Sequence, residues 1–374
     1  MPEVPAHEKV LVSEAYLADP NHGKASCVSC HGGDASGATR KLAHVGMNAD
    51  PTKDGGKLCA TCHSETVKKN ENSLHRTLAG IRNSFVERSG SSTLSTALDT
   101  SFKNHCSRCH ASCGDCHVRV PQAAGGGLLD KHKFRKTPSM TLVCTACHGS
   151  RVGDEYRGQN VGYAADVHYE KGMQCVACHK GGEMHGDGAA GVTHRYQVST
   201  APKCANCHPD NATFKATVAH AQHRATDGKL KLSCQTCHSL TYKNCSSCHV
   251  RLESGKAVYE VNAPTHESLM TFKIGYNAAP DTLHPEKWVV VRHVPADPDD
   301  YKYYGAGLLT SFDVAPTWRL ATPHNIRRKT PQNASCDGCH GKRSMFLGTA
   351  DLASYETTAN AKVVVPDTAI PTFP

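Results

Sequence analysis

All 20 cysteines of this 374-residue chain belong to one repeated pattern, Cys-x-x-Cys-His, and none is left over. The chain also has 25 histidines but only 6% aromatic residues, so side chains alone supply little material for a core. We number the ten motifs in chain order: Cys27, Cys30 and His31; Cys59, Cys62 and His63; Cys106, Cys109 and His110; Cys113, Cys116 and His117; Cys144, Cys147 and His148; Cys175, Cys178 and His179; Cys204, Cys207 and His208; Cys234, Cys237 and His238; Cys245, Cys248 and His249; Cys336, Cys339 and His340.

Cys-x-x-Cys-His is the attachment signature of c-type haem. The two thiols form thioethers with the haem vinyl groups, and the adjacent histidine becomes an axial ligand of the iron. Zinc ribbons and iron–sulfur sites also use clustered cysteines, but neither requires a histidine directly after the second cysteine every time. A disulfide framework would not repeat one spacing without exception. The sequence therefore predicts ten covalently attached haem c groups.

A six-coordinate haem needs a second axial ligand, commonly His or Met. Ten of the 25 histidines lie in motifs, which leaves fifteen, whereas seven methionines are too few. Matched positions in the two halves of the chain favour ten of them: His22, His44, His75, His105, His132, His168, His194, His220, His223 and His324. Five stay open: His7, His185, His266, His284 and His293. Of these, His185 competes with His194, while His7 and the histidines of the insertion described next could ligate a haem of a neighbouring subunit.

The motifs recur in two similar series. CVSCHGG at 27–33 matches CVACHKGG at 175–182, and HKFRKTP at 132–138 matches HNIRRKTP at 324–331. Repetition in the same order predicts two five-haem modules, residues 1–160 and 161–374, the second with an insertion at about 252–323. Each module contains a doublet of closely spaced motifs, at 106–117 and 234–249, where we expect two haems nearest each other.

Each haem buries a large apolar ring, so ten of them could form a continuous core. We therefore expect a haem-cored fold, mostly loops and short α-helices wrapped round a chain of ten haems. The insertion differs, because WVVVRHV at 288–294 has the composition of a β-strand. AVYEV at 257–261 and LMTFKI at 269–274 are its candidate partners, so a small β element is expected there.

The charge and the compartment follow from the same prediction. About two propionate charges per haem, partly offset by ferric iron, would bring the formal +8 to about −2, which removes the case for nucleic acid. No apolar run approaches the ~18 residues of a membrane span. The first ten residues contain no apolar stretch, so no signal peptide is expected in this chain. Since haem c is attached after export, the expected location is extracellular or periplasmic.

Through its ten motifs, nearly the whole chain resembles the multihaem (decahaem) c-type cytochromes, both conduit and filament-forming extracellular types, of metal-reducing bacteria. The resemblance implies an electron carrier without catalytic residues, foremost a subunit of an extracellular filament, or nanowire, in extracellular respiration. The redox partners of the chain would be other cytochromes or extracellular electron acceptors. Further copies of the chain would be its partners in a homopolymer. A discrete periplasmic or surface electron conduit is the first alternative. A multihaem reductase of nitrite, hydroxylamine or a sulfur oxyanion is the second, with Tyr303, Tyr304 or Arg292 near an open iron.

Overall fold

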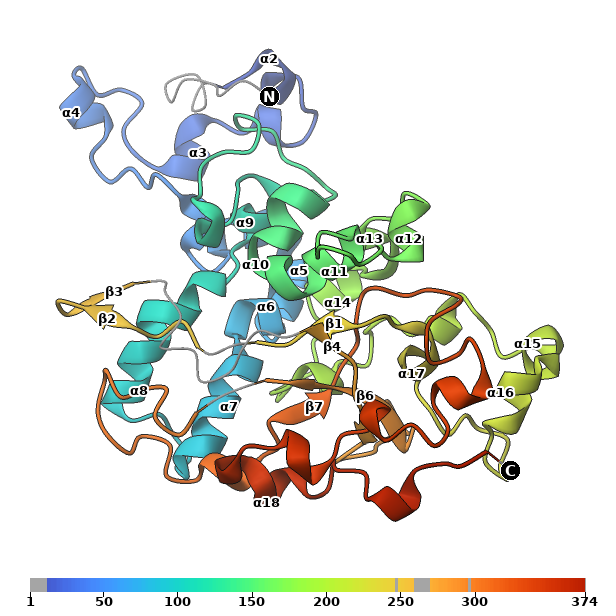
Figure 1. Ribbon diagram of the computed structural model, residues 1–374. Coiled ribbons are helices and arrows are strands. Elements are labelled where there is room, and N and C mark those ends of the chain that lie inside the picture. Colours follow the sequence, from blue (N-terminus) through green and yellow to red (C-terminus); the bar gives the residue numbers. More distant parts are fainter. Residues whose placement is uncertain (1–11, 246–247, 259–269, 295–296, 374) are drawn as a thin grey trace. The chain divides into compact units, whose positions relative to one another are not determined.

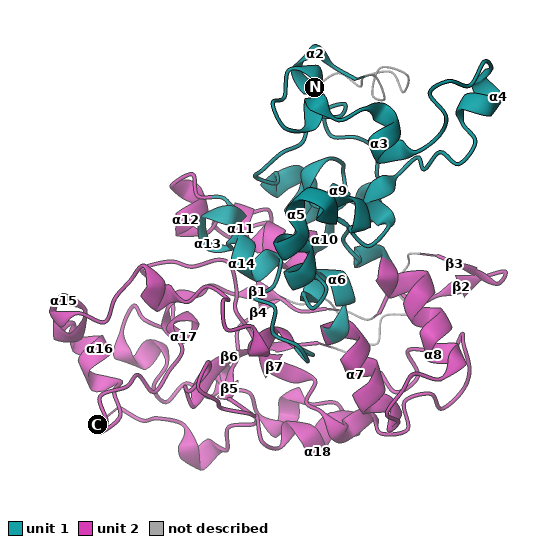
Figure 2. Cartoon of the chain, turned by 180° about the vertical axis from the view of Figure 1, so that it is seen from behind, with its two compact units in different colours: residues 1–79, 108–148, 174–193 teal, residues 80–107, 149–173, 194–374 magenta. Residues whose placement is uncertain are grey.

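A computed structural model describes residues 12–245, 248–258, 270–294 and 297–373 (Figure 1). The chain divides into two compact units, each assembled from segments that are far apart in sequence (Figure 2). Unit 1 comprises residues 1–79, 108–148 and 174–193, and unit 2 comprises residues 80–107, 149–173 and 194–374. These boundaries do not coincide with the sequence repeat, so the two five-haem modules stay a prediction about the sequence.

Unit 1 is built from short helices joined by loops. A serine begins several of them: the Ser26 hydroxyl accepts a hydrogen bond from the backbone of Ser29 at 3.2 Å, which caps the helix of motif 1. The helices are α2 (Glu14–Leu17), α3 (Cys27–His31), α4 (Arg40–Ala43), α5 (Lys57–Asn70), α6 (Leu74–Thr77), α9 (Cys113–His117), α10 (Thr145–His148), α13 (Cys175–Cys178) and α14 (Gly181–Met184).

Unit 2 contains further short helices and all the strands of the described residues. The helices are α7 (Ala79–Ser89), whose first residue belongs to unit 1, α8 (Thr96–Ser101), α11 (Asp154–Arg157), α12 (Val167–Glu170), α15 (Ala212–Ala216), α16 (Val218–Gln222), α17 (Cys234–His238) and α18 (Thr357–Asn360). The strands are β1 (Tyr242–Lys243), β2 (Leu252–Glu253), β3 (Lys256–Ala257), β4 (Met270–Thr271), β5 (Ile274–Tyr276), β6 (Trp288–His293) and β7 (Trp318–Leu320).

The strand predicted at 288–294 is present as β6, the central strand of an antiparallel sheet ordered β5-β6-β7. Val290 pairs with Ile274, and Val291 pairs with Leu320. The predicted partners were largely wrong: of the segment 269–274, residues 270–271 form β4, which pairs with β1, and Ile274 is the first residue of β5; residue 269 lies outside the described residues. Ala257 pairs with Leu252 in a separate hairpin, and 259–261 lie outside the described residues. The sequence did not predict β7 as a partner of β6, because its three residues are too few to show the alternation of a strand.

Both faces of β6 are buried, which explains its unbroken run of valines. Val289 and Val291 pack with Trp318, Leu347 and Val363. On the opposite face, Val290 packs with Tyr242 and Ala321. The chain after α18 returns along this sheet, and the carbonyl of Val363 accepts a hydrogen bond from the backbone of Tyr276 at 2.9 Å. This part of unit 2 therefore has an ordinary hydrophobic core.

No helix in the described ranges combines the length and the apolar character that crossing a membrane requires. The longest helix there, α5, has 14 residues and carries several charges. A spanning helix needs about 20 mostly apolar residues. The prediction of no membrane span holds for this part of the chain.

Candidate haem-binding motifs

Three of the motifs lie wholly on one short α-helix. Helix α3 runs from Cys27 to His31, α9 from Cys113 to His117, and α17 from Cys234 to His238. Residues three and four apart share one face of a helix, so both thiols and the histidine point to the same side. A thioether pair and an axial ligand for one macrocycle require that arrangement. The spacing Cys-x-x-Cys-His thus follows from helical geometry.

The second cysteine of a motif does not always lie on that turn. Motif 1 shows the regular case: Cys30 lies within α3, and its Sγ is 4.0 Å from the hydroxyl of the adjacent serine, Ser29. In motif 7, the short turn η9 (Cys204–Asn206) ends before Cys207, which is exposed. The backbone of His208 still donates to the Cys204 carbonyl at 2.8 Å, so the chain keeps one helical hydrogen bond there. The expected regular turn is therefore incomplete at motif 7, and thioether attachment at Cys30 and Cys207 stays a prediction.

Motif 10 resembles motif 7 in its local structure. Its first residues form the short turn η11 (Cys336–Gly338), which ends before Cys339. Burial raises the pKa of Cys339 to about 11, and burial also raises the pKa of Cys237 in motif 8. All 20 motif cysteines lie in the described ranges, and none of them is joined in a disulfide.

Motif 9 is interrupted by two residues that the structure does not describe. Residues 246–247 lie between Cys245 and Cys248, so the expected turn falls partly outside the described ranges. Burial, followed by the charge of Asp300, raises the pKa of Cys248. His249, which ends the motif, is half-buried. The thioether roles of Cys245 and Cys248 and the axial role of His249 stay predictions.

Seven motif histidines each face a histidine from outside the motifs. The ring centroids lie 5.9–6.2 Å apart in every case, within one unit of the structure. In unit 1 the pairs are His31–His132, His63–His22, His117–His185 and His148–His75. In unit 2 they are His208–His168, His238–His220 and His340–His223.

This spacing is too wide for a direct hydrogen bond between the rings, and it matches what one iron between two imidazoles requires. A ligating nitrogen lies about 1 Å from its ring centroid and about 2 Å from a bound metal, which gives about 6 Å between the centroids. The interplanar angles range from 28° for His22 and His63 to 81° for His75 and His148. The distance between the two rings is therefore nearly the same in all seven pairs, whereas the angle between the rings varies. Two ligands of one shared atom are expected to behave in this way.

The Nδ1 atoms of many of these histidines are held by hydrogen bonds. His31 Nδ1 donates to the Asn48 carbonyl at 2.8 Å, and His117 Nδ1 to the Arg135 carbonyl at 2.6 Å. Because a carbonyl oxygen only accepts, Nδ1 carries the proton and Nε2 keeps a lone pair for a metal. The same arrangement holds at His168, His179, His220, His223, His238 and His340, with a carbonyl or carboxylate oxygen as the acceptor.

Electrostatics favour neutral rings at several of these positions. Burial, together with the charge of His31, lowers the pKa of His132. Burial also lowers the pKa of His185, with smaller contributions from His117 and His75. Only a neutral imidazole has the lone pair that a metal needs, so these surroundings suit a ligand. The paired histidines therefore fit haem in spacing, and several of them fit it in tautomer or protonation as well.

Two of the other motif histidines have different neighbours. His110 Nε2 lies 3.0 Å from Nη1 of Arg76, so its surroundings differ from those of the paired motif histidines. His179 keeps the common Nδ1 contact, to Glu183 Oε2 at 2.8 Å. Burial, followed by the charge of Arg76, lowers the pKa of His110. Motif 3 is therefore distinct from the seven paired motifs.

Four predicted axial histidines have other surroundings. His44 is exposed at the end of α4, and His105 Nε2 lies 2.8 Å from the Tyr304 hydroxyl. His194 accepts from the backbone of Tyr196 at 3.4 Å and caps a short turn; burial and nearby arginines lower its pKa to about 4. The backbone of His324 donates to Glu155 at 3.2 Å. Their role as ligands stays a prediction.

The sequence left His185 open, and in the structure it lies opposite a motif histidine. It faces His117 at 6.0 Å, whereas His194, its competitor, packs on Tyr196 at 4.3 Å. The only sequence signal for it was its proximity to motif 6, and its partner belongs to motif 4. Offsets from the nearest motif could not find this pair, because the pairing is made by the tertiary structure.

The remaining open histidines lie elsewhere. His284 packs on Tyr196 at 5.5 Å, and His293 Nε2 is bonded to Glu356 at 3.0 Å. His7 and His266 lie outside the described residues. Arg292, considered for a reductase site, forms an ion pair with Glu155.

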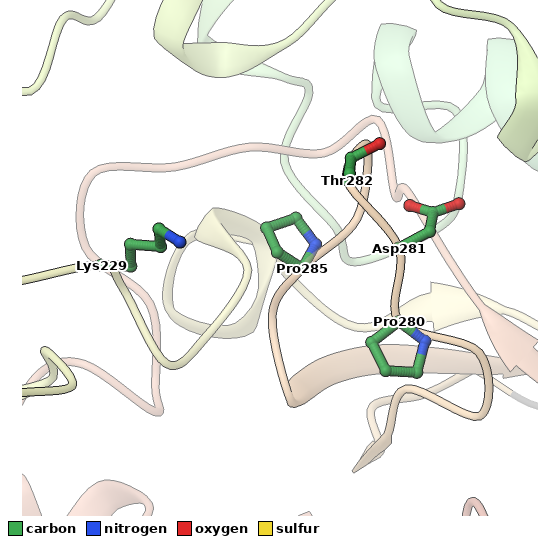
Figure 3. Close-up of a pocket in the computed structure, with 5 residues that line it drawn as sticks. All are labelled: Lys229, Pro280, Asp281, Thr282 and Pro285. Atoms are coloured by element: carbon green, nitrogen blue, oxygen red, sulfur yellow. The ribbon is translucent and has the colours of Figure 1, made fainter. Parts of the chain in front are cut away.

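A conventional metal cluster or a pocket would be another kind of candidate site in the described residues. In the described residues, no three His, Cys, Asp or Glu side chains converge as a metal site, whereas a haem iron takes only two protein ligands. Figure 3 shows a pocket of about 510 Å³ in unit 2, lined by Lys229, Pro280, Asp281, Thr282 and Pro285. No motif residue lines it. No family model, curated protein or solved structure matches the chain.

Proposed function

We propose that this chain is a multihaem c-type cytochrome that carries electrons between ten covalently attached haems. The observation that carries the proposal is the set of seven motif histidines that each face a second histidine at 5.9–6.2 Å. Ten thioether motifs without exception in the sequence support the same cofactor.

Bound haem supplies a one-electron iron couple whose potential depends on the axial ligands and on burial. The chain supplies the positions. Paired histidines close both faces of an iron, which leaves no vacant position for a substrate and favours electron transfer over catalysis. In every pair in which an oxygen accepts from Nδ1, that bond fixes the ring, so the ligand would not need to rearrange when the charge of the iron changes.

The cofactor is tested by the absorbance of the denatured protein in alkaline pyridine and by iron analysis, with about ten haems per chain expected. Haem that is extracted by acidified acetone would overturn covalent attachment. Axial pairing is tested by electron paramagnetic resonance (EPR) of the oxidised protein, where low-spin ferric signals should dominate. A predominant high-spin signal, with nitrite binding at low concentration, would favour a reductase instead.

A matched pair of variants tests the histidine pairs individually. His75→Ala should add one high-spin ferric site per chain, because it removes the partner of His148. His284→Ala should leave the spectrum unchanged, because His284 packs on Tyr196. Identical spectra for the two variants would contradict the assignment of His75.

The assembly is a separate proposal that rests on the resemblance of the sequence. We propose a subunit of an extracellular filament in which copies of the chain pass electrons to an external acceptor. Electron microscopy of the purified protein should show long regular fibres. Monomers at every concentration would reject the filament and leave the discrete periplasmic or surface conduit.

A further inference from the structure

The thiols of motif 5 lie against thiols of other motifs in unit 1. Cys147 is hydrogen-bonded to Cys109 of motif 3. Cys144 is hydrogen-bonded to Cys175 of motif 6. In the loaded protein each sulfur is attached to the edge of a macrocycle, so sulfurs in contact bring two such edges together. Motif 5 thus meets two different motifs through its two cysteines.

A third neighbour comes from packing of the backbone. The turn η6 (Met140–Cys144), which leads into motif 5, contacts α9 of motif 4 and α13 of motif 6. Met140 and Val143, in this turn, are almost fully buried. Cys116, the second cysteine of motif 4, lies on α9, the helix that packs against this turn. Motif 4 is therefore next to motif 5.

The axial side of motif 5 gives independent support. His75, the partner of His148, is also hydrogen-bonded to the backbone of Met184, in the helix α14 that follows motif 6. The neighbours of motif 5 therefore include motif 6 through both a thiol and an axial histidine.

Motif 4 has a different second neighbour. Cys113 is hydrogen-bonded to Cys59 of motif 2. A Cβ added at Gly56, at the start of α5, would lie 3.6 Å from the same Cys113 sulfur. Contacts in unit 1 therefore run from motif 2 to motif 4, then to motifs 5 and 6. Motif 3 contacts this series at motif 5, through Cys109 and Cys147.

We propose that motif 5 is a three-way junction for electrons in unit 1, with the sites of motifs 3, 4 and 6 as its neighbours and motif 3 as a side arm. The proposal rests on the proposed function and deepens it. Electron exchange between two neighbouring sites oxidises one iron and reduces the other, and needs no further reactant. A side arm gives the carrier an additional point at which a redox partner can exchange electrons, beside the exposed His110.

The test uses the reduction potential of the junction site. His75→Met should give this iron one sulfur ligand, which raises its potential and makes its spectrum distinct. In this background the haem of motif 3 is removed by Cys106→Ala with Cys109→Ala. Charge interactions weaken with distance, and the proposal makes motifs 3 and 4 both direct neighbours of motif 5. Loss of the motif 3 haem should therefore shift the reduction potential of the sulfur-ligated iron about as much as loss of the motif 4 haem.

The matched control removes the haem of motif 2 with Cys59→Ala and Cys62→Ala, and it should shift that potential much less. Equal small shifts from removing motifs 2 and 3 would overturn the junction and leave electron transfer itself intact. A protein with no covalent haem would instead overturn the proposed function. Should a variant fail to fold, a crystal structure of the loaded full chain decides: edges of three macrocycles next to that of motif 5 support the junction, and two overturn it.

Discussion

Unit 1 and unit 2 fill their interiors in different ways. In the described part of unit 1, the buried apolar side chains are few: Leu78, Val118, Met140 and Val143. Unit 2 buries many more, and around β6 they form three continuous clusters. Yet unit 1 holds five complete motifs and four of the seven histidine pairs.

Under the proposed function, this difference makes unit 1 the part of the chain that depends on haem for its core. A core needs apolar area removed from water, at about 25 cal/mol per Å². The sheet of unit 2 obtains this from its own side chains, whereas unit 1 has little to bury except the macrocycles that its motifs would hold. The low aromatic content noted in the sequence thus applies most strongly to unit 1.

The largest expected effect is the loss of unit 1 when haem is withheld. The full chain, produced without haem attachment, should keep slow hydrogen exchange in β6 but lose it in α9 and α10, because only the sheet has its own core. Mass spectrometry of exchanged peptides measures both regions in one sample. Protection of α9 equal to that in the loaded protein would show that unit 1 folds without its cofactor.

The sequence predicted local features well and pairings poorly. Cys-x-x-Cys-His fits one helical turn, and the valines of β6 indicate a buried strand. The partner of each motif histidine could not be predicted, because it depends on which loops meet in space. His22 lies five residues before Cys27 but faces His63 of the next motif.

The repeat helped only where both copies kept the same pairing. His168 faces His208, which repeats the relation of His22 to His63. His75 and His220 occupy matched positions, but one faces the fifth motif and the other the eighth. An inserted segment changes which loops can meet in space. The number of residues between a histidine and a motif carries no information on that change.

The next effect should come from the core of unit 2. Phe346 is 2% exposed and packs with Ile274 and Val365. Phe346→Ala should lower the free energy of unfolding of the sheet region by about 4 kcal/mol, since it removes buried area and leaves a cavity. Val314→Ala, at a 57% exposed site, should change it by less than about 0.5 kcal/mol. Urea unfolding followed by tryptophan fluorescence measures both; equal changes would contradict the proposed core.

A buried ion pair beside the sheet should have a somewhat smaller effect. Glu155 is 2% exposed, and Arg292, its counter-charge, lies 4.9 Å over the ring of Tyr242. Arg292→Met should cost about 3 kcal/mol, because it leaves a buried carboxylate without its partner. Burial already raises the pKa of Glu155, although Arg292 opposes this. The loss should therefore shrink at acid pH, where the carboxyl is protonated.

The double change Arg292→Met with Glu155→Gln is the control for that pair. It removes both charges and should recover much of the lost stability at neutral pH. Urea midpoints of the two variants at neutral and acid pH separate the charge from the packing of the Arg292 side chain. A double variant no more stable than Arg292→Met would show that packing, and not the uncompensated charge, sets the cost.

The smallest effect concerns the pH dependence of unit 2. Burial alone would raise the pKa of Glu356, but hydrogen bonds and charge from His293, with a hydrogen bond from Thr317, lower it below the ordinary 4.5. Because the folded pKa is the lower one, this stabilisation is fully present above the unfolded pKa and is lost as pH falls through the folded value. Glu356→Gln should cost about 1 kcal/mol at pH 7 and flatten the acid limb of the urea midpoint. An acid limb as steep as that of the unmodified chain would place the titrating group elsewhere, and the carboxylates of unit 1 would then be the next to replace.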